Sequence, residues 1–226
     1  MTFIPSETIA APAGLHGGSA APDQYDAPTP GGIRPLKMVI AGGFAAGKTT
    51  FVEAISEITP LTTEAPMTSY SVGIDDAGDI TSKTTTTVAM DFGRLTISPT
   101  TMLYLFGTPG QDRFWFMWDE LSKGAVGAIV LVDSRRLADC FGAIDYFEHR
   151  NLPYVVAMNC FGGLLAHEVD DVREALALAA DIPLVAIDAR DRSSAKGVLM
   201  ALVRHAIACR KRAVAPAPDP SSSGMF

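Results

Sequence analysis

The sequence predicts an α/β fold in which about six strands form a mostly parallel sheet, with one antiparallel edge and helices on both faces. Three observations support this prediction. Apolar runs alternate with amphipathic segments, a glycine-rich loop follows the first apolar run, and two strand-like runs are separated only by a short turn. The 226 residues, 48% of them hydrophobic, are enough for one domain with a sizeable core.

The two ends of the chain differ in composition from its middle. Residues 1–33 are rich in Ala, Pro, Gly and Thr, and residues 213–226 are rich in Ala, Pro and Ser. Such composition is typical of disordered segments, because it offers little apolar surface to bury. We therefore expect a folded domain over residues 34–212, flanked by two disordered tails.

Within that domain, short continuous apolar runs are typical of central parallel strands, which are buried on both faces. The runs occur at residues 36–41, 125–132, 154–158 and 184–187. Between them, apolar residues recur at helical spacing and predict buried helix faces. These faces are Leu137, Cys140, Phe141, Ile144 and Phe147; Val172, Leu176 and Ala179; and Val198, Leu199, Leu202, Val203, Ala206 and Ile207.

Residues 88–97 and 101–106 predict an antiparallel hairpin that turns at Ser98-Pro99. The parity of the apolar positions switches at Gly93, which predicts a β-bulge at that residue. Residues 59–83 are long, polar and interrupted by proline and glycine, so we expect an extended mobile loop before the hairpin.

The most informative motif is Gly-Gly-Phe-Ala-Ala-Gly-Lys-Thr over residues 42–49, which fits the P-loop pattern G-x-x-x-x-G-K-[ST]. It follows a predicted strand and opens a helix-like segment over residues 50–58, as the motif requires. Lys48 would reach the β- and γ-phosphates of a nucleotide, and the Thr49 hydroxyl would ligate Mg²⁺. The predicted nucleotide-binding residues of this loop are Gly42, Gly43, Phe44, Ala45, Ala46, Gly47, Lys48, Thr49 and Thr50.

A second motif follows the hairpin, at Gly-Thr-Pro-Gly-Gln-Asp-Arg-Phe over residues 107–114. The Gly110 N–H group can bind a γ-phosphate, and Gln111 can orient an attacking water molecule. The plain alternative is an ordinary turn at the exit of a strand, since Pro-Gly is a common turn pair.

These motifs together resemble the conservon-encoded Ras-like GTPases of actinomycetes, which are relatives of the polarity GTPase MglA of gliding bacteria. The stretches that carry the resemblance are GFAAGKTT, TTTTVAMDFG, FGTPGQDRFWFMW, LVDSRRLADCF and NCF, within residues 35–210. The resemblance implies a Ras-like P-loop NTPase that binds GTP and GDP with Mg²⁺ and hydrolyses GTP slowly as a molecular switch, with Lys48 and Gln111 as catalytic residues.

The same resemblance implies a second metal ligand and a partner. A threonine just before the hairpin would complete the Mg²⁺ shell; Thr87 is the first choice and Thr86 the second. The alternative is that the four threonines at 84–87 only favour strand formation. A roadblock-type regulatory protein is expected to dock against the switch regions, within a membrane-associated signalling complex.

The metal-binding position of the second motif departs from the Ras-like pattern. Most Ras-like proteins carry Asp at the position of Gly107, so Mg²⁺ would rely on Thr49, Thr87, phosphate oxygens and water. Asp133 ends an apolar run and could be taken for the missing metal carboxylate, but we interpret it as structural. Arg113 is near enough to Gln111 to act as an arginine finger, although solvation at the surface is the preferred interpretation.

The guanine-reading motif N-K-x-D appears here as Asn159-Cys160-Phe161-Gly162, so the base-binding carboxylate is absent. Its loss from a site built for guanine would weaken discrimination strongly. Asn159 is retained. Asp188-Ala189-Arg190 resembles the last GTPase motif, in which the Ala189 N–H group would bind guanine O6, the alternative being an ordinary strand exit.

An aromatic run follows Gln111. On a helix, Phe114, Met117, Trp118 and Leu121 would share a buried face, whereas Trp115 and Phe116 would be partly exposed. Exposed aromatic residues beside a switch favour a partner interface, and packing under the preceding loop is the alternative.

Composition indicates which partners and which cellular location to expect. A net charge of −7 argues against nucleic acid as a partner. No run of about 18 apolar residues predicts a transmembrane segment, and no signal peptide is visible. Three widely spaced cysteines suit a cytoplasmic protein, recruited to a membrane only peripherally through partners. The alternatives to a GTPase are a pseudo-GTPase scaffold and an ATPase or nucleotide kinase.

Overall fold

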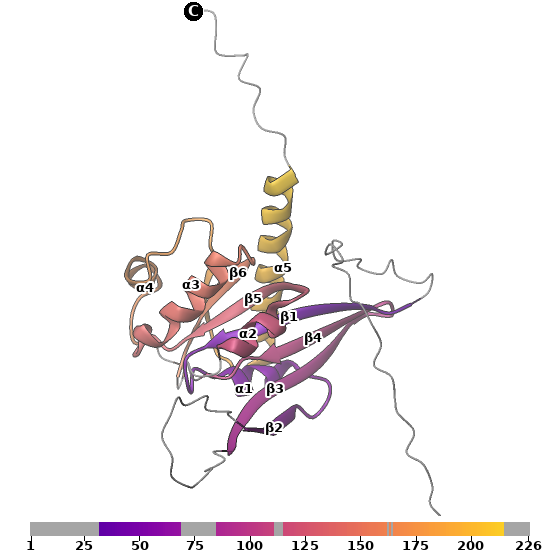
Figure 1. Ribbon diagram of the computed structural model, residues 1–226. Coiled ribbons are helices and arrows are strands. Elements are labelled where there is room, and N and C mark those ends of the chain that lie inside the picture. The colour runs from indigo at the N-terminus through magenta and orange to yellow at the C-terminus, as the bar shows by residue number, and fades with distance from the viewer. Residues whose placement is uncertain (1–31, 69–84, 111–114, 162, 164, 215–226) are drawn as a thin grey trace, which may run out of the picture.

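A computed structural model (Figure 1) describes residues 32–68, 85–110, 115–161, 163 and 165–214. The strands are β1 (Arg34–Gly42), β2 (Leu61–Thr68), β3 (Thr85–Ser98), β4 (Thr101–Gly107), β5 (Ala125–Val132), β6 (Tyr154–Asn159) and β7 (Leu184–Ile187). The helices are α1 (Lys48–Ile55), α2 (Phe116–Ser122), the short 3₁₀ helix η2 (Leu137–Cys140), α3 (Phe141–His149), α4 (Val169–Ala175) and α5 (Arg192–Val214). The tail predictions fall almost entirely outside these ranges, except that α5 continues to Val214.

The strands form one sheet in the order β2-β3-β4-β1-β5-β6-β7. β3 is antiparallel to β2 and β4, and the other neighbours are parallel. The predicted α/β architecture is therefore confirmed, with a mostly parallel sheet and an antiparallel edge. The carboxyl ends of the parallel strands all lie at the same end of the sheet, and this is the end at which doubly wound folds bind their ligands.

The prediction of a loop throughout residues 59–83 was wrong at its start. Residues 61–68 form β2, which pairs with β3 from Leu61 opposite Phe92 to Thr68 opposite Thr85. β2 is an edge strand, so it needs a hydrogen-bonded partner on only one side and tolerates Pro66. Residues 69–83 of the predicted loop lie outside the described residues.

The predicted bulge at Gly93 was also wrong. β3 and β4 stay in register through Gly93, and the irregularity falls between Thr96 and Ser98. Asp91, Gly93 and Leu95 are buried on one face of β3, and a Cβ on Gly93 would lie 2.7 Å from the side chain of Val52 in α1. The apolar parity switches because a carboxylate and a glycine occupy buried positions of a regular strand.

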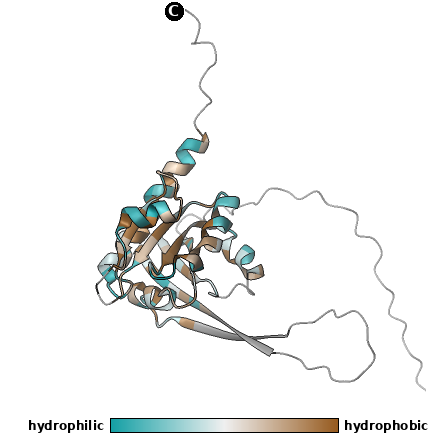
Figure 2. Cartoon of the chain, turned by 90° about the vertical axis from the view of Figure 1, so that its left-hand side faces the viewer, coloured by the Kyte–Doolittle hydropathy of each residue, from teal (hydrophilic) through white to brown (hydrophobic). Residues whose placement is uncertain are grey.

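Two hydrophobic cores lie on opposite faces of the sheet. Side chains of α1 and α5 pack on one face, and those of α2, α3 and α4 pack on the other. Figure 2 shows hydrophobic residues concentrated in the strands and hydrophilic ones on the outer sides of the helices. No helix in the described ranges is both long and apolar enough to span a membrane.

Most of the predicted helix faces are buried, but four of their members are exposed: Phe141, Ala179, Val203 and Ile207. Ala179 lies beyond the end of α4. Phe141 is the first residue of α3 and follows η2, whose tighter turn shifts the phase of the α-helical repeat. In α5, Val198, Leu199, Leu202 and Ala206 face the sheet, and this stripe is narrower than the six-residue face that we predicted.

Candidate nucleotide-binding site

The loop between β1 and α1 has the backbone that a phosphate-binding loop needs. Gly42 and Gly47 have φ angles of +138° and +104°, which side chains rarely adopt. A Cβ on Gly42 would overlap the Leu131 carbonyl, and one on Gly47 would lie 2.6 Å from the Asn159 amide nitrogen. Only glycine therefore fits both ends of the loop.

The start of α1 leaves N–H groups available to an anion. Gly47 caps this helix without a side-chain hydrogen bond, and the first-turn N–H groups of Lys48, Thr49 and Thr50 have no carbonyl partner within the helix. Ala45 in the same loop has a strained φ of +59°. The positive end of the helix dipole points at the same place, so the loop favours a bound phosphate.

Lys48 lies in the centre of this loop. Its side chain is buried, and Nζ donates hydrogen bonds to the carbonyl oxygens of Gly42, at 2.9 Å, and Gly43, at 2.7 Å. Burial lowers the pKa of Lys48 to about 8, although the charge of Asp91 opposes that shift. The Lys48 ammonium group is thus bonded to two neutral carbonyl groups. Phosphate oxygens could take the place of these carbonyls as its hydrogen-bond acceptors.

The lowered pKa of Lys48 predicts how nucleotide affinity depends on pH. A bound triphosphate would favour the protonated amine and raise its pKa, so binding above pH 8 would take up a proton. We expect affinity to be constant below pH 8 and to fall as the pH rises from about 8 to 10. Isothermal titration calorimetry at pH 9 in buffers of different ionisation enthalpy would measure the proton uptake; no uptake would contradict this prediction.

Thr49 is joined to a carboxylate that the sequence interpretation missed. Its Oγ1 donates a hydrogen bond of 2.8 Å to Oδ2 of Asp91, a buried residue of β3. Gly107 lies on the neighbouring strand β4, where a Cβ would be 3.1 Å from the same Oδ2 atom. The carboxylate of Asp91 therefore fills the space beside the position at which most Ras-like proteins carry their aspartate.

These two residues fit a magnesium ion. The Thr49 hydroxyl donates its hydrogen bond to Asp91, which leaves the lone pairs of the Thr49 oxygen available to a cation, and Mg²⁺ prefers oxygen ligands. In the part of the chain that the structure describes, no group of three or more His, Cys, Asp or Glu residues is placed so that it could hold a metal ion. A magnesium site shared with phosphates needs only one or two carboxylates from the protein.

The other proposed metal ligand is less well defined. Thr87 does not precede the strand as predicted; it lies within β3 and pairs with Pro66 of β2. Its side chain is not among those described, and neither is that of Thr86. The metal role of Thr87 therefore stays a prediction.

The second motif starts beside the P-loop. The Thr108 N–H group bonds the Ile40 carbonyl at 2.8 Å, which fixes the chain after β4 against β1. A Cβ on Gly110 would lie 2.8 Å from Lys48 Nζ, so the predicted γ-phosphate glycine reaches the predicted phosphate lysine. Gln111, Arg113 and Phe114 lie outside the described residues, and their predicted roles remain predictions.

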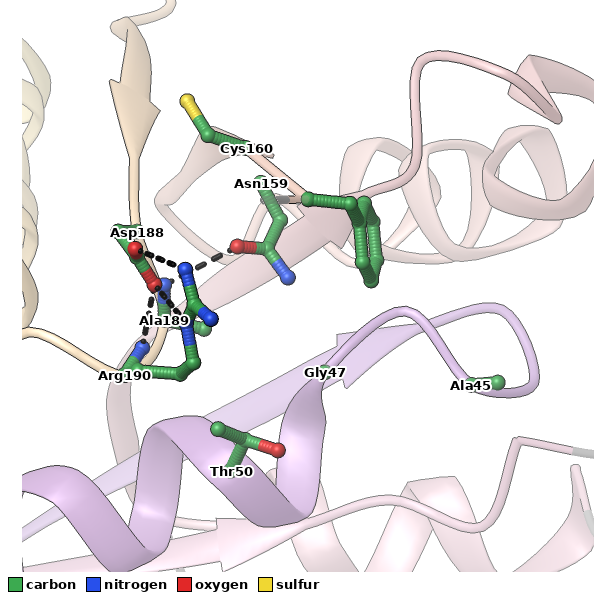
Figure 3. Close-up of a pocket in the computed structure, with 9 residues that line it drawn as sticks. Ala45, Gly47, Thr50, Asn159, Cys160, Asp188, Ala189 and Arg190 are labelled. Carbon is green, nitrogen blue, oxygen red and sulfur yellow. Dashed lines mark hydrogen bonds and ion pairs between the residues drawn. The ribbon is translucent and has the colours of Figure 1, made fainter. Parts of the chain in front are cut away.

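Asn159 joins the P-loop to the ends of β6 and β7. Its buried amide donates to the Ala46 carbonyl at 3.1 Å and accepts from the Ala189 N–H group at 3.0 Å, as Figure 3 shows in part. The predicted base-side residues are therefore in contact. The Ala189 N–H group is already bonded here, and its bond to guanine O6 stays a prediction.

A cavity of about 200 Å³ opens between these residues and the P-loop. Its wall includes Asp188 and Arg190, which form a bidentate ion pair: Nε donates to Oδ1 at 2.9 Å and Nη2 to Oδ2 at 2.7 Å. These hydrogen bonds lower the pKa of Asp188 to about 2, so the carboxylate is ionised at neutral pH. Burial and the charge of Asp188 raise the pKa of the neighbouring Cys160 thiol.

Asp133 has the structural surroundings that we preferred for it. Arg135 donates to both of its carboxylate oxygens, at 2.8 and 2.7 Å, and Arg136 lies 3.6 Å away. Arg136 also donates from Nη2 to the Phe44 carbonyl at 2.8 Å. Arg136 therefore connects Asp133 to the backbone of the P-loop at Phe44. The sequence analysis assigned no role to Arg136.

The predicted buried face of the aromatic run is confirmed at two of its four positions, because Met117 is half-buried and Phe114 lies outside the described residues. Trp118 and Leu121 are buried, whereas Trp115 and Phe116 are exposed to 39% and 59%. The Trp115 indole stacks on Trp118, with the ring centroids 5.6 Å apart, and covers Gly142 of α3. Trp115, Gly110 and Phe44 line a cavity of about 400 Å³ beside the P-loop.

The fold and this site have the architecture of a Ras-like G domain with a P-loop. Comparison with solved structures supports that class. The Arl6 BBS3 small GTPase from Trypanosoma brucei, with bound GppNp, has a TM-score of 0.54 and 18% identity, over 77% of this chain and 99% of that one. The G domain of the T. maritima FeoB iron transporter has a TM-score of 0.50 and 17% identity, over 78% and 99%.

The chain belongs to the family described as conserved hypothetical ATP-binding proteins, whose model matches residues 40–209. An uncharacterized protein of Methanocaldococcus jannaschii is 32% identical over 126 residues, which are 55% of this chain and 69% of that protein. The description of the family names ATP binding, whereas the likeness to G domains comes from the structure.

Proposed function

We propose that this protein is a small GTP-binding switch that binds GTP with Mg²⁺, hydrolyses it slowly and signals through partners at its switch regions. The observation that carries the proposal is the convergence on one loop of the buried Lys48, the Thr49–Asp91 pair and Gly110. A P-loop lysine, a metal-binding hydroxyl and a γ-phosphate glycine are the parts that phosphoryl transfer from a nucleotide requires.

In the proposed reaction, water attacks the γ-phosphate. Gln111 orients the water, and Lys48 neutralises the charge that develops on the phosphoryl oxygens. Thr49, with Asp91 beside it, would hold Mg²⁺, whose positive charge would further neutralise the phosphates. Loss of the γ-phosphate would release Gly110 and Thr87, so both switch segments would relax. No arginine finger is assigned, and slow turnover without a partner is expected.

The choice between GTP and ATP depends on the base pocket. The family description names ATP, whereas an NFeoB variant from S. thermophilus bound GDP and Arl6 bound GppNp. Asn159 supports a G-domain pocket because it links the P-loop to the strand ends around the base. Gly162 supports the rival function, a pseudo-GTPase scaffold or weak nucleotide-binding module.

We also propose the surroundings in which this switch works. The exposed Trp115 and Phe116 suit docking of a roadblock-type partner in a membrane-associated complex. All three cysteines are free, which suits the reducing cytoplasm. Membership of the conservon-encoded GTPases is part of the same proposal and is supported by the motifs of the sequence.

One experiment separates the candidate functions. The purified protein is titrated with fluorescent GDP, GTP and ATP analogues, with and without Mg²⁺, and phosphate release is then measured. Preferential, Mg²⁺-dependent GTP binding with slow phosphate release is expected. Equal binding of ATP would contradict guanine selectivity, and absence of binding would favour the scaffold.

A further inference from the structure

The base pocket contains a carboxylate that the motif comparison did not assign. In the N-K-x-D pattern the base-reading aspartate would stand at Gly162, which has no side chain. Among the described residues that line the pocket, Asp188 is the one acidic residue. A carboxylate is the group that recognises guanine best, because the N1–H and N2–H groups of the base are adjacent donors.

The fold places Asp188 beside the segment that lost its carboxylate. Ile187, the last residue of β7, pairs with Asn159 at the end of β6, and its carbonyl accepts a hydrogen bond from Cys160. Asp188 is the next residue after this pair, and its charge acts on the Cys160 thiol. The pocket thus has a carboxylate that follows β7, whereas in the N-K-x-D pattern the carboxylate would follow β6.

The present partner of Asp188 shows what this carboxylate can accept. The Arg190 guanidinium offers it two parallel N–H donors, Nε and Nη2, attached to one carbon atom. The N1–H and 2-amino groups of guanine are likewise attached to one carbon atom and offer the same donor pattern. Arg190 is exposed, with 63% of its side chain accessible, so it can leave this position without opening the core.

We propose that Asp188 is the guanine-specifying residue, and that Arg190 occupies its carboxylate until the base displaces it. This inference rests on the proposed function, since it requires a nucleotide in the pocket. Adenine would be disfavoured because its N1 atom is an acceptor and would face the negative carboxylate. Removing such a bidentate acceptor from a site built for it costs a large factor in discrimination.

The test replaces Asp188 with asparagine and measures dissociation constants for GDP, XDP and ADP. The amide of the introduced asparagine can donate to the O2 atom of xanthine, but it cannot accept both guanine donors. We expect Asp188→Asn to weaken GDP binding at least tenfold, to strengthen XDP binding by a similar factor and to leave ADP binding unchanged. Asp170→Asn, at an exposed position of α4, is the control for the lost charge.

The gain in XDP binding keeps the test independent of folding, because a misfolded variant would lose affinity for all three nucleotides. Unchanged GDP and XDP affinities would overturn the assignment of Asp188, and so would a wild-type preference for ADP. If the wild-type protein binds none of the nucleotides, the proposed function itself fails. Arg190→Ala should bind GDP at least as well as the wild type; weaker binding would overturn the displacement of Arg190.

Discussion

Replacing Lys48 with alanine should reduce the affinity for GTP at least about a hundredfold. A hydrogen bond to a charged group contributes about 1.5–3 kcal/mol, and the lysine is expected to contact both the β- and γ-phosphates. Two such contacts correspond to about 3 kcal/mol or more, and 1.4 kcal/mol is a factor of about ten. The loss would be measured by titration with a fluorescent GTP analogue.

The matched control for this variant is Lys196→Ala, which removes an exposed lysine of α5 and changes the net charge equally. Its affinity for GTP should equal that of the wild type. Wild-type affinity in Lys48→Ala would contradict the phosphate-binding role of the loop. Circular dichroism of the nucleotide-free variant would show whether the fold is retained.

Replacing Asp91 with asparagine should weaken Mg²⁺-dependent GTP binding at least about tenfold. The neutral amide can still accept the Thr49 hydroxyl proton, but it loses the charge that favours a cation near the phosphates. Binding in EDTA should change much less, because the P-loop contacts to phosphate remain. The ratio of the two affinities is the measurement, and an unchanged ratio would contradict the metal role of Asp91.

A carboxylate swap tests the same interpretation by rescue. The double variant Asp91→Gly with Gly107→Asp moves the carboxylate to the neighbouring strand, into the space that Asp91 leaves. We expect the swap to restore most of the Mg²⁺ dependence that Asp91→Gly removes. Its stability should be close to that of the wild type, because the exchange leaves the number of glycines in β3 and β4 unchanged.

The single variant Gly107→Asp adds a second carboxylate while Asp91 keeps its own, so it should be less stable than the wild type. A Cβ at Gly107 would lie 3.0 Å from the Cβ of Asp91, so both carboxylates cannot fit without displacement. Two adjacent negative charges would also repel each other. A lower midpoint of thermal unfolding is expected for the nucleotide-free protein, and unchanged stability would argue against the close contact of these positions.

The sequence alone determined the parts of this protein that depend on neighbouring residues. The P-loop was predictable because Gly42, Gly47, Lys48 and Thr49 act through one continuous stretch of backbone. The central strands were predictable because they are buried on both faces and so appear as continuous apolar runs. The exposed positions of Trp115 and Phe116 followed from helical spacing.

Only the tertiary structure decided the features that depend on adjacent strands. Asp91 is 16 residues before Gly107, yet the pairing of β3 with β4 brings its carboxylate to that position. Likewise, the pairing of β6 with β7 brings Asp188 beside the altered guanine motif. A sequence motif reports the backbone of its own stretch of residues. Which carboxylate lies beside that stretch depends instead on the register of the neighbouring strand, and this register is visible only in the folded chain.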